Sequence, residues 1–203
     1  SICPLCKRHE WAHANTCAPL PNGDIMVSYR VLNLLIIIDR QTGKIKWEHH
    51  DIDLGHQHDC HMLDNGNVLV YANGMHGGDI FYSRILEFDP DSKETAWEYS
   101  GKPVLSFFSP HISGMQRLDS GNTLICEGGK GCIFEVTRKA ISFGSIFLAF
   151  GRTALLLATS TGFSAPTGMP LTVRKFKIGF DYSAATFFAA CSAAIKRSIN
   201  LPD

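Results

Sequence analysis

The sequence contains Leu63-Asp-Asn-Gly-Asn67, followed directly by Val68-Leu-Val-Tyr71. This pattern occurs three times in the chain, and the repetition indicates the fold. In each copy a leucine, two further residues, a glycine and then Asp or Asn precede an alternating apolar run. Asn-Gly and Ser-Gly pairs before such runs are typical of tight β-hairpin turns. The other two copies are Leu20-Pro-Asn-Gly-Asp24 before Ile25–Tyr29 and Leu118-Asp-Ser-Gly-Asn122 before Thr123–Cys126.

A second apolar run follows in the first two copies and leads to a tryptophan. Ile36–Asp39 runs on to Trp47, and Ile85–Phe88 runs on to Trp97. Repeats of roughly 40 to 55 residues built from short strands are the sequence signature of a β-propeller. We therefore predict an all-β fold over residues 12–135, a partial β-propeller of about three blades, with both tryptophans packing the blades.

Composition narrows the range of partners. Lys and Arg together number 19 and balance 19 Asp and Glu, so no electrostatic field favours nucleic acid or an anionic membrane surface. The apolar stretch Ile141–Thr159 is a poor membrane span, because Arg152 interrupts it and two glycines dilute it. We predict neither a nucleic acid nor a membrane partner, and the oligomeric state is left open.

No metal or cofactor is assigned. Cys3, Cys6, His9 and His13 are spaced too closely for a finger-like zinc site, which stays a minor alternative. A metal pair from His56 and His58 is a second alternative, but no nearby carboxylate spacing completes it. His49 and His50 follow a strand and are expected on an exposed loop.

The sequence changes character after Lys139. Residues 1–135 hold 17 of the 19 acidic residues, and residues 136–180 hold none. A shifted reading frame from Lys139 onward can restore a Val-Trp-Glu-Tyr strand that parallels Ala96–Tyr99. We therefore divide the chain into a partial propeller, residues 1–139, and an aberrant, frame-shifted tail without a function of its own, residues 140–203.

A histidine stands seven residues before the leucine of every copy, at His13, His56 and His111. Residues that recur at one position of a propeller repeat point toward one shared place. We predict that His13, His58 and His111 begin equivalent strands and approach one channel mouth, with Arg30 reaching toward it.

Three motifs resemble the bacterial arylsulfotransferase family, whose members have a PQQ-like β-propeller. Trp11-Ala-His13-Ala-Asn15 precedes Ser28-Tyr-Arg30, Gln57-His58-Asp59 opens the next copy, and Ser109-Pro-His111 opens the third. The likeness covers roughly residues 8–139. It implies a six-bladed ring that transfers a sulfuryl group from one phenol to another without a nucleotide donor.

The resemblance also implies roles for individual residues. The Gln-His element makes His58 the nucleophile that carries the sulfuryl group, and the other motifs make His13 and Arg30 sulfate ligands. His111, at the repeat position, is a further candidate for binding sulfate. The family uses one more histidine from an earlier blade, which implies that this chain alone is inactive, and the family suggests a periplasmic or secreted protein.

These residue types suit sulfuryl transfer. A neutral imidazole has a usable lone pair near pH 7, and covalent catalysis divides the transfer into two steps. Arginine offers a planar fork that matches sulfate oxygens. The alternative interpretation, from a different class of function, is a non-catalytic β-propeller that binds a ligand or a partner protein.

Overall fold

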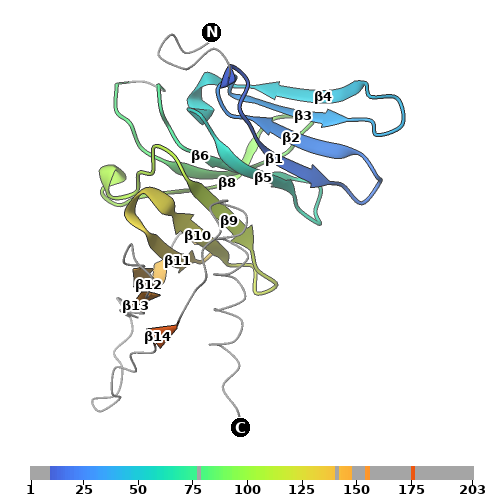
Figure 1. Cartoon of the computed structure of the whole chain (residues 1–203). Coiled ribbons are helices and arrows are strands. Elements are labelled where there is room, and N and C mark those ends of the chain that lie inside the picture. Colours follow the sequence, from blue (N-terminus) through green and yellow to red (C-terminus); the bar gives the residue numbers. More distant parts are fainter. Residues whose placement is uncertain (1–9, 77–78, 140–141, 148–153, 156–174, 177–203) are drawn as a thin grey trace, which may run out of the picture.

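The computed structural model describes residues 10–76 and 79–139, together with the backbone of residues 142–147, 154–155 and 175–176. Three four-stranded antiparallel sheets follow one another along the chain, and we call them blades 1, 2 and 3 (Figure 1). In each blade the strands lie in sequence order. This meander of short strands confirms the predicted all-β partial propeller.

The bounds of the strands are as follows. Blade 1 consists of β1 (Ala14–Pro19), β2 (Ile25–Tyr29), β3 (Leu34–Ile38) and β4 (Ile45–His50). Blade 2 consists of β5 (His58–Met62), β6 (Val68–Ala72), β7 (Arg84–Phe88) and β8 (Thr95–Ser100). Blade 3 consists of β9 (Ser113–Arg117), β10 (Thr123–Glu127), β11 (Cys132–Val136) and β12 (Ser142–Phe147). A separate short ladder joins β13 (Ala154–Leu155) to β14 (Lys175–Phe176).

Three single 3-10 turns lie in the connections between strands. They are η2 (Ile52–Leu54), η3 (Val104–Ser106) and η4 (Gly128–Lys130). No helix among these residues is long and apolar enough to cross a membrane.

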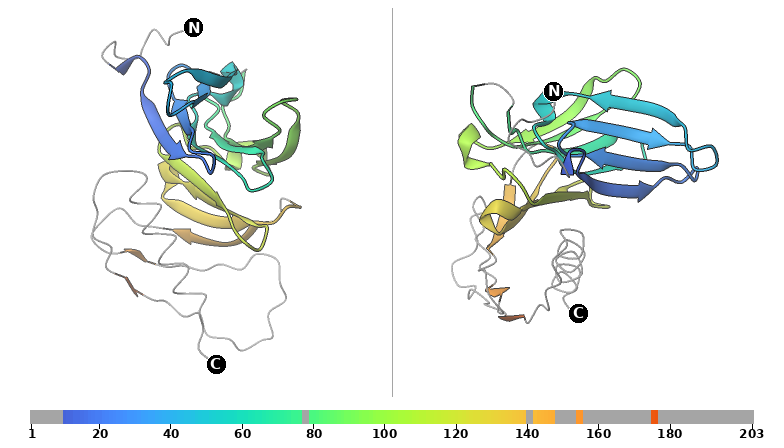
Figure 2. Two further views of the ribbon diagram at one scale, coloured as in Figure 1. Left: turned by 90° about the vertical axis from the view of Figure 1, so that its right-hand side faces the viewer. Right: turned by 45° about the horizontal axis from the view of Figure 1, so that its top comes forward.

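The first strand of each blade lies innermost. β5 lies against β1 on one side and against β9 on the other, so the three blades are arranged around their first strands (Figures 1 and 2). Because hairpins join the strands, the loops alternate between two ends of each blade. The end at which the first strands begin also carries the β2–β3, β4–β5, β6–β7 and β8–β9 connections, and we call it the site end.

The repeated Leu-x-x-Gly pattern forms the turn at the opposite end. In each copy the glycine N–H donates to the leucine carbonyl, at 2.9 Å, and the leucine N–H donates to the carbonyl of the Asp or Asn. The glycines adopt left-handed backbone with φ of 83° to 89°, which is why glycine recurs there. The predicted turns at Asn22-Gly23, Asn65-Gly66 and Ser120-Gly121 are thus confirmed.

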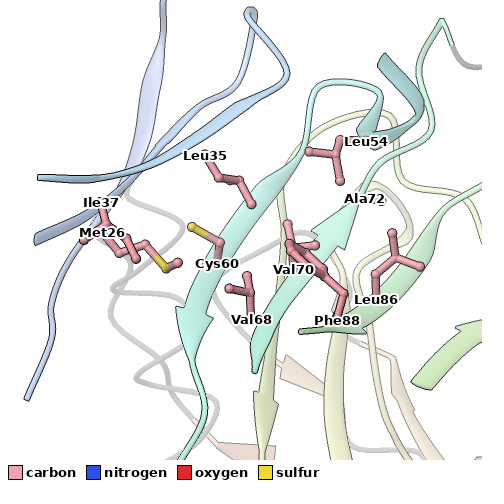
Figure 3. Packing of buried hydrophobic residues seen from close by; sticks show 10 residues of the cluster. All are labelled: Met26, Leu35, Ile37, Leu54, Cys60, Val68, Val70, Ala72, Leu86 and Phe88. Atoms are coloured by element: carbon pink, nitrogen blue, oxygen red, sulfur yellow. The ribbon is translucent and has the colours of Figure 1, made fainter. Parts of the chain in front are cut away.

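Buried side chains fill the spaces between blades. Alternate residues of β6 serve both sides, because neighbouring side chains of a strand point to opposite faces. Val68, Val70 and Ala72 belong to the core shared with blade 1, shown in Figure 3, whereas Leu69 and Tyr71 belong to the core shared with blade 3. β6 is therefore buried along its whole length.

Each predicted packing tryptophan joins its own blade to the next. Trp47 Nε1 donates a hydrogen bond of 2.8 Å to the Pro90 carbonyl in blade 2. Trp97 Nε1 donates an equally long bond to the Arg138 carbonyl in blade 3. The tryptophans therefore have a structural role that fixes neighbouring blades against one another.

His49 and His50 were predicted to lie on an exposed loop, but they belong to β4. The ring of His49 packs on Phe88 at 4.8 Å between centroids.

The strand β12 lies beyond the predicted boundary at residue 139 and still pairs with β11. Sheet pairing uses backbone groups, so it tolerates a change of side-chain pattern. Most of the predicted tail lies outside the described residues.

Candidate functional site

His58 is the first residue of β5 and lies at the site end. The first strands of the three blades can be aligned by the residue pair that each makes with the second strand of its blade. These pairs are Cys17 with Val27 in blade 1, Cys60 with Val70 in blade 2 and Met115 with Ile125 in blade 3. Two residues earlier in each strand, Asn15, His58 and Ser113 occupy equivalent places. His58 therefore begins β5, as predicted, but it lies two residues further along the repeat than His13 and His111, whose counterpart is His56.

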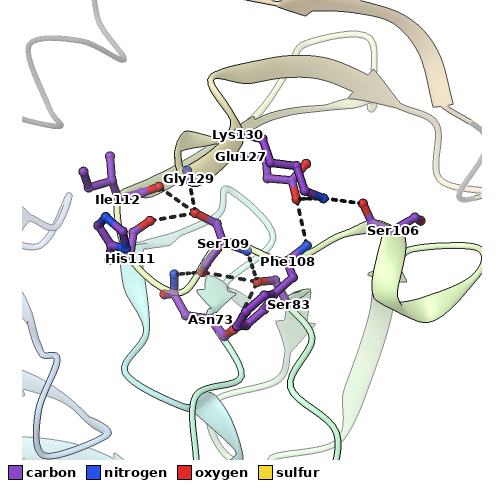
Figure 4. Close-up of polar contacts among 10 residues, drawn as sticks. All are labelled: Asn73, Ser83, Ser106, Phe108, Ser109, His111, Ile112, Glu127, Gly129 and Lys130. Carbon is purple, nitrogen blue, oxygen red and sulfur yellow. Dashed lines mark hydrogen bonds and ion pairs between the residues drawn. The ribbon is translucent and has the colours of Figure 1, made fainter. Parts of the chain in front are cut away.

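Asn73 fixes the ring of His58. The Nδ1 atom of His58 lies 2.9 Å from Asn73 Oδ1. The amide nitrogen of Asn73 donates to the Ser109 carbonyl at 2.7 Å (Figure 4). It also donates to Ser113 Oγ at 3.1 Å, so the amide oxygen is the atom that faces His58. Since an amide oxygen only accepts, Nδ1 carries the proton and Nε2 keeps its lone pair.

Burial keeps His58 neutral. Desolvation lowers the pKa of His58 from 6.5 to about 4, and the charges of Arg30 and His13 act in the same direction. The hydrogen bond that the ring donates to Asn73, together with one to the His56 backbone, raises the pKa of His58 but offsets this shift only in part. At pH 7 the ring is therefore an uncharged imidazole with a free nitrogen lone pair, which is the form of histidine that acts as a nucleophile.

Gln57 and Asn15 hold the start of β5 against blade 1. Asn15 Nδ2 donates to the Gln57 carbonyl at 2.8 Å. The Gln57 side chain is fully buried, and its amide donates to Ser28 Oγ at 3.1 Å and to the Tyr29 carbonyl at 3.2 Å. The residues of the sequence motifs thus contact one another across the boundary between blades 1 and 2, which sets the position of His58.

A bulge next to His58 ties the strand to blade 3. The pairing of β5 with β6 shifts between His58 and Cys60, and Asp59 adopts left-handed backbone with φ of 43°. Its Oδ2 atom accepts a hydrogen bond of 2.8 Å from the Met115 N–H. Bulges of this kind redirect a side chain next to a functional site. His58 is thereby supported by blades 1, 2 and 3 together.

His56 and His76 belong to the same cluster, which the sequence analysis did not assign to the site. The rings of His56 and His76 pack edge to face at 4.8 Å. Burial lowers the pKa of His56 to about 4, and the charges of Arg30, His76, His58 and His13 contribute to the shift. Five groups that can carry positive charge therefore lie near one another at the boundary of blades 1 and 2.

The predicted sulfate ligands differ in how closely they join this cluster. His13 and Arg30 act electrostatically on both His56 and His58. His13 is exposed, and its Nδ1 lies 3.8 Å from a carboxylate oxygen of Glu10. His111 is also exposed and lies on the blade 3 side, where its carbonyl accepts from Ser109 Oγ at 2.6 Å (Figure 4). The charges that lower the pKa of His58 most are those of Arg30 and His13, both from blade 1.

Asn73 is the site residue that sequence reasoning missed. It stands directly after β6, and Arg30 stands directly after β2, so the two residues occupy the same place in successive blades. Comparing that position between repeats would have singled out both residues.

The described residues contain no group of three or more His, Cys, Asp or Glu side chains suited to a metal ion.

Blades arranged around their first strands define a β-propeller fold, and at one end of it the charge of Arg30 acts on a neutral histidine, His58. The family model described as Arylsulfotransferase (ASST) matches residues 7–142. The chain belongs to this family. Comparison with curated proteins gives no significant match.

Solved structures agree with the fold. A protein of unknown function from Bacteroides caccae matches with a TM-score of 0.52 and 18% identity, over 81% of this chain and 60% of that one. A streptogramin B lyase matches with a TM-score of 0.50 and 15% identity, over 82% and 55% respectively. At these identities the likeness shows the fold alone. The chain spans about 60% of the length of the Bacteroides protein.

Proposed function

We propose that the protein transfers a sulfuryl group between phenolic compounds through a sulfated His58. The observation that supports this most directly is the hydrogen bond between His58 Nδ1 and Asn73 Oδ1, because it leaves Nε2 unprotonated. Membership of the arylsulfotransferase family supplies the substrate class, phenols and their sulfate esters.

The reaction balances in two steps. In the first, the Nε2 lone pair attacks the sulfur of an aryl sulfate, an N–S bond forms, and the bond from sulfur to the aryl oxygen breaks. The released phenolate takes up a proton. In the second, a phenol gives up its proton, its oxygen attacks the same sulfur, and the N–S bond breaks to return neutral His58.

The cationic neighbours have a separate task. Sulfate oxygens carry negative charge throughout both steps, and groups already in place stabilise the additional charge of the transition state. We assign this task to Arg30 and His13, whose charges already act on His58, and we retain His111 as a candidate ligand from blade 3.

We propose that catalysis requires a closed ring of propeller blades. The family resemblance requires a further histidine from another blade, so we expect the 203-residue chain alone to bind a sulfate ester without turnover. We place complete transfer in a protein in which further blades close the ring.

The experiment follows the covalent intermediate. A ring-closed protein containing this chain is incubated with 4-nitrophenyl sulfate, 4-nitrophenol release is followed by absorbance, and the sulfated peptide is located by mass spectrometry. We expect the sulfuryl group on His58 and its loss in His58→Asn. Arg30→Lys should bind more weakly and react more slowly, because a point charge replaces a fork. Binding of the ester without any sulfated histidine would favour the alternative, a non-catalytic ligand-binding propeller.

A further inference from the structure

Three aromatic rings run from the buried cluster to the surface, and we call them the aromatic row: His56, His76 and Phe81. His56 is buried, and its ring meets His76 edge to face at 4.8 Å. His76 meets Phe81 in the same manner at 6.4 Å. Phe81 is 45% exposed and its neighbour Ile80 is 54% exposed. The row therefore ends in two large apolar side chains that face solvent.

The connection that carries the outer rings is held at both ends. Gly74 N–H donates to the Leu54 carbonyl at 3.3 Å, and Met75 N–H donates to the Gly55 carbonyl at 3.0 Å. After the loop, Arg84 donates to the Asp53 carbonyl at 3.0 Å. All three acceptors precede His56 directly in the chain. The β6–β7 connection and the segment leading to His58 thus form one supported assembly.

The inner end of the row reaches the proposed sulfate site. His56 is two residues before His58, and the charges of Arg30, His58 and His13 all act on its ring. A sulfate group held by Arg30 and His13 beside His58 would therefore direct the rest of its ester toward a neighbouring surface. The aromatic row provides such a surface, with rings that pack edge to face.

We propose that His76 and Phe81 bind the aryl group of the substrate and select aromatic sulfate esters over alkyl ones. This assignment rests on the proposed function, since it takes the sulfate to lie beside His58. Aromatic rings in contact attract one another through their quadrupoles as well as through burial of apolar surface. A bound aryl ring would cover apolar surface of Phe81 and Ile80 that otherwise faces solvent.

Binding to the 203-residue chain tests the assignment without requiring turnover. Dissociation constants are measured by NMR titration for 2-naphthyl sulfate, methyl sulfate, inorganic sulfate and 2-naphthol. Phe81→Ala should weaken 2-naphthyl sulfate by about 3- to 10-fold and leave methyl sulfate unchanged, since methyl sulfate has no ring to lose contact. His76→Ala should act in the same direction.

Matched variants separate the ring from general disturbance. Phe81→Tyr keeps the aromatic ring and should retain affinity for 2-naphthyl sulfate. Phe81→Leu keeps an apolar side chain without a ring and should bind 2-naphthyl sulfate more weakly. Ile45→Ala removes a comparably exposed apolar side chain, 56% exposed, on blade 1 at the end away from the site, and should change nothing.

The ligand set distinguishes the two proposals. Equal weakening of naphthyl and methyl sulfate in Phe81→Ala, or no weakening of either, would overturn the aryl site alone. If inorganic and methyl sulfate do not bind, but 2-naphthol binds in a manner that depends on Phe81, the aryl site stands and the sulfate site fails. Failure of all four ligands would overturn both.

Discussion

At His58 a single amide decides which ring nitrogen is available for reaction. Asn73 cannot rotate to offer its nitrogen without losing two hydrogen bonds, to the Ser109 carbonyl and to Ser113 Oγ. Three residues from blade 3 and blade 2 thus determine the tautomer of one imidazole. In the reaction that we propose, the lone pair of Nε2 would thus be in place before substrate binds, without a change of tautomer.

The tautomer gives the first prediction. In the folded chain, nitrogen-15 NMR of the imidazole groups should show His58 protonated at Nδ1 and unprotonated at Nε2 at pH 7. Its titration midpoint should lie near pH 4, because burial disfavours the charged form. Asn73→Asp keeps the acceptor oxygen but adds negative charge, so it should raise the pKa of His58. A His58 midpoint near 6.5 in the unaltered chain would contradict this picture.

Stability should respond to acid through the same residues. Both His56 and His58 have a pKa of about 4 when folded and near 6.5 when unfolded. Between these values the unfolded chain binds more protons, so the free energy of unfolding should fall as the pH drops from about 6.5 to about 4. Above 6.5 their contribution should be constant.

Urea denaturation at pH 7.5, 5.5 and 4.5 measures this dependence. The double variant His56→Asn, His58→Asn lacks both titrating groups. Its free energy of unfolding should therefore change less between pH 6.5 and pH 4 than that of the unaltered chain. His50→Asn, at an exposed position of β4, is the matched control and should leave the slope unaltered. An identical pH profile for the double variant and the unaltered chain would exclude these histidines as its source.

The turns are the elements that the sequence describes best, because their requirements are local. Glycine is needed where φ is positive, and an Asn or Ser three residues before the next strand accepts a backbone hydrogen bond from the residue two positions later. The position of Asn73 was not predictable in this way. Its partners lie 15, 36 and 40 residues away in the chain, and only the stacking of blades brings them together.

Two glycines illustrate this difference and give a second stability prediction. Gly66 has φ of 87° and open space where a Cβ would stand, so Gly66→Ala should cost about 1 kcal/mol from backbone strain alone. Gly74 has φ of 74°, and a Cβ there would overlap the Tyr82 carbonyl oxygen. Gly74→Ala should therefore destabilise the chain much more than Gly66→Ala. Equal midpoints of urea unfolding for the two variants would contradict the described close approach.

A buried carboxylate joins blades 2 and 3 at the end away from the site. Glu87 is 1% exposed and accepts from Arg117 at 2.7 Å, from Arg138, and from Asn65 and Asn67. The guanidinium of Arg117 also lies over the Trp97 ring at 4.7 Å. The carboxylate therefore balances two cations at the boundary between the blades.

Glu87→Gln should lower the free energy of unfolding by roughly 3–5 kcal/mol, because it leaves partly buried arginines without their counter-charge. Glu98→Gln, at an exposed position of β8, should change it by less than about 0.5 kcal/mol. Chemical denaturation of both variants checks the contrast. A loss below about 1 kcal/mol for Glu87→Gln would mean that water already screens this group.

The candidate site draws its residues from all three blades and lies at the boundaries between them. Blade 1 supplies His13 and Arg30, blade 2 supplies His58 and Asn73, and blade 3 holds Asn73 in place. The sequence predicted the repeat and most of these residues, since each blade carries its own motif. The spacing of the repeats already aligned His56 with His13 and His111. The sequence did not predict the bulge between His58 and Cys60, because it depends on how β5 pairs with β6.

The bonds from the tryptophans have a direction along the chain. Trp47 donates to a residue 43 positions later, and Trp97 to one 41 positions later. During synthesis on the ribosome, the strands of blade 1 can pair as soon as they emerge, yet the acceptor for Trp47 does not exist until Pro90 has been added. Each of these two bonds can therefore form only after part of the following blade has been synthesised, so an incomplete chain always lacks the tryptophan bond of its last blade.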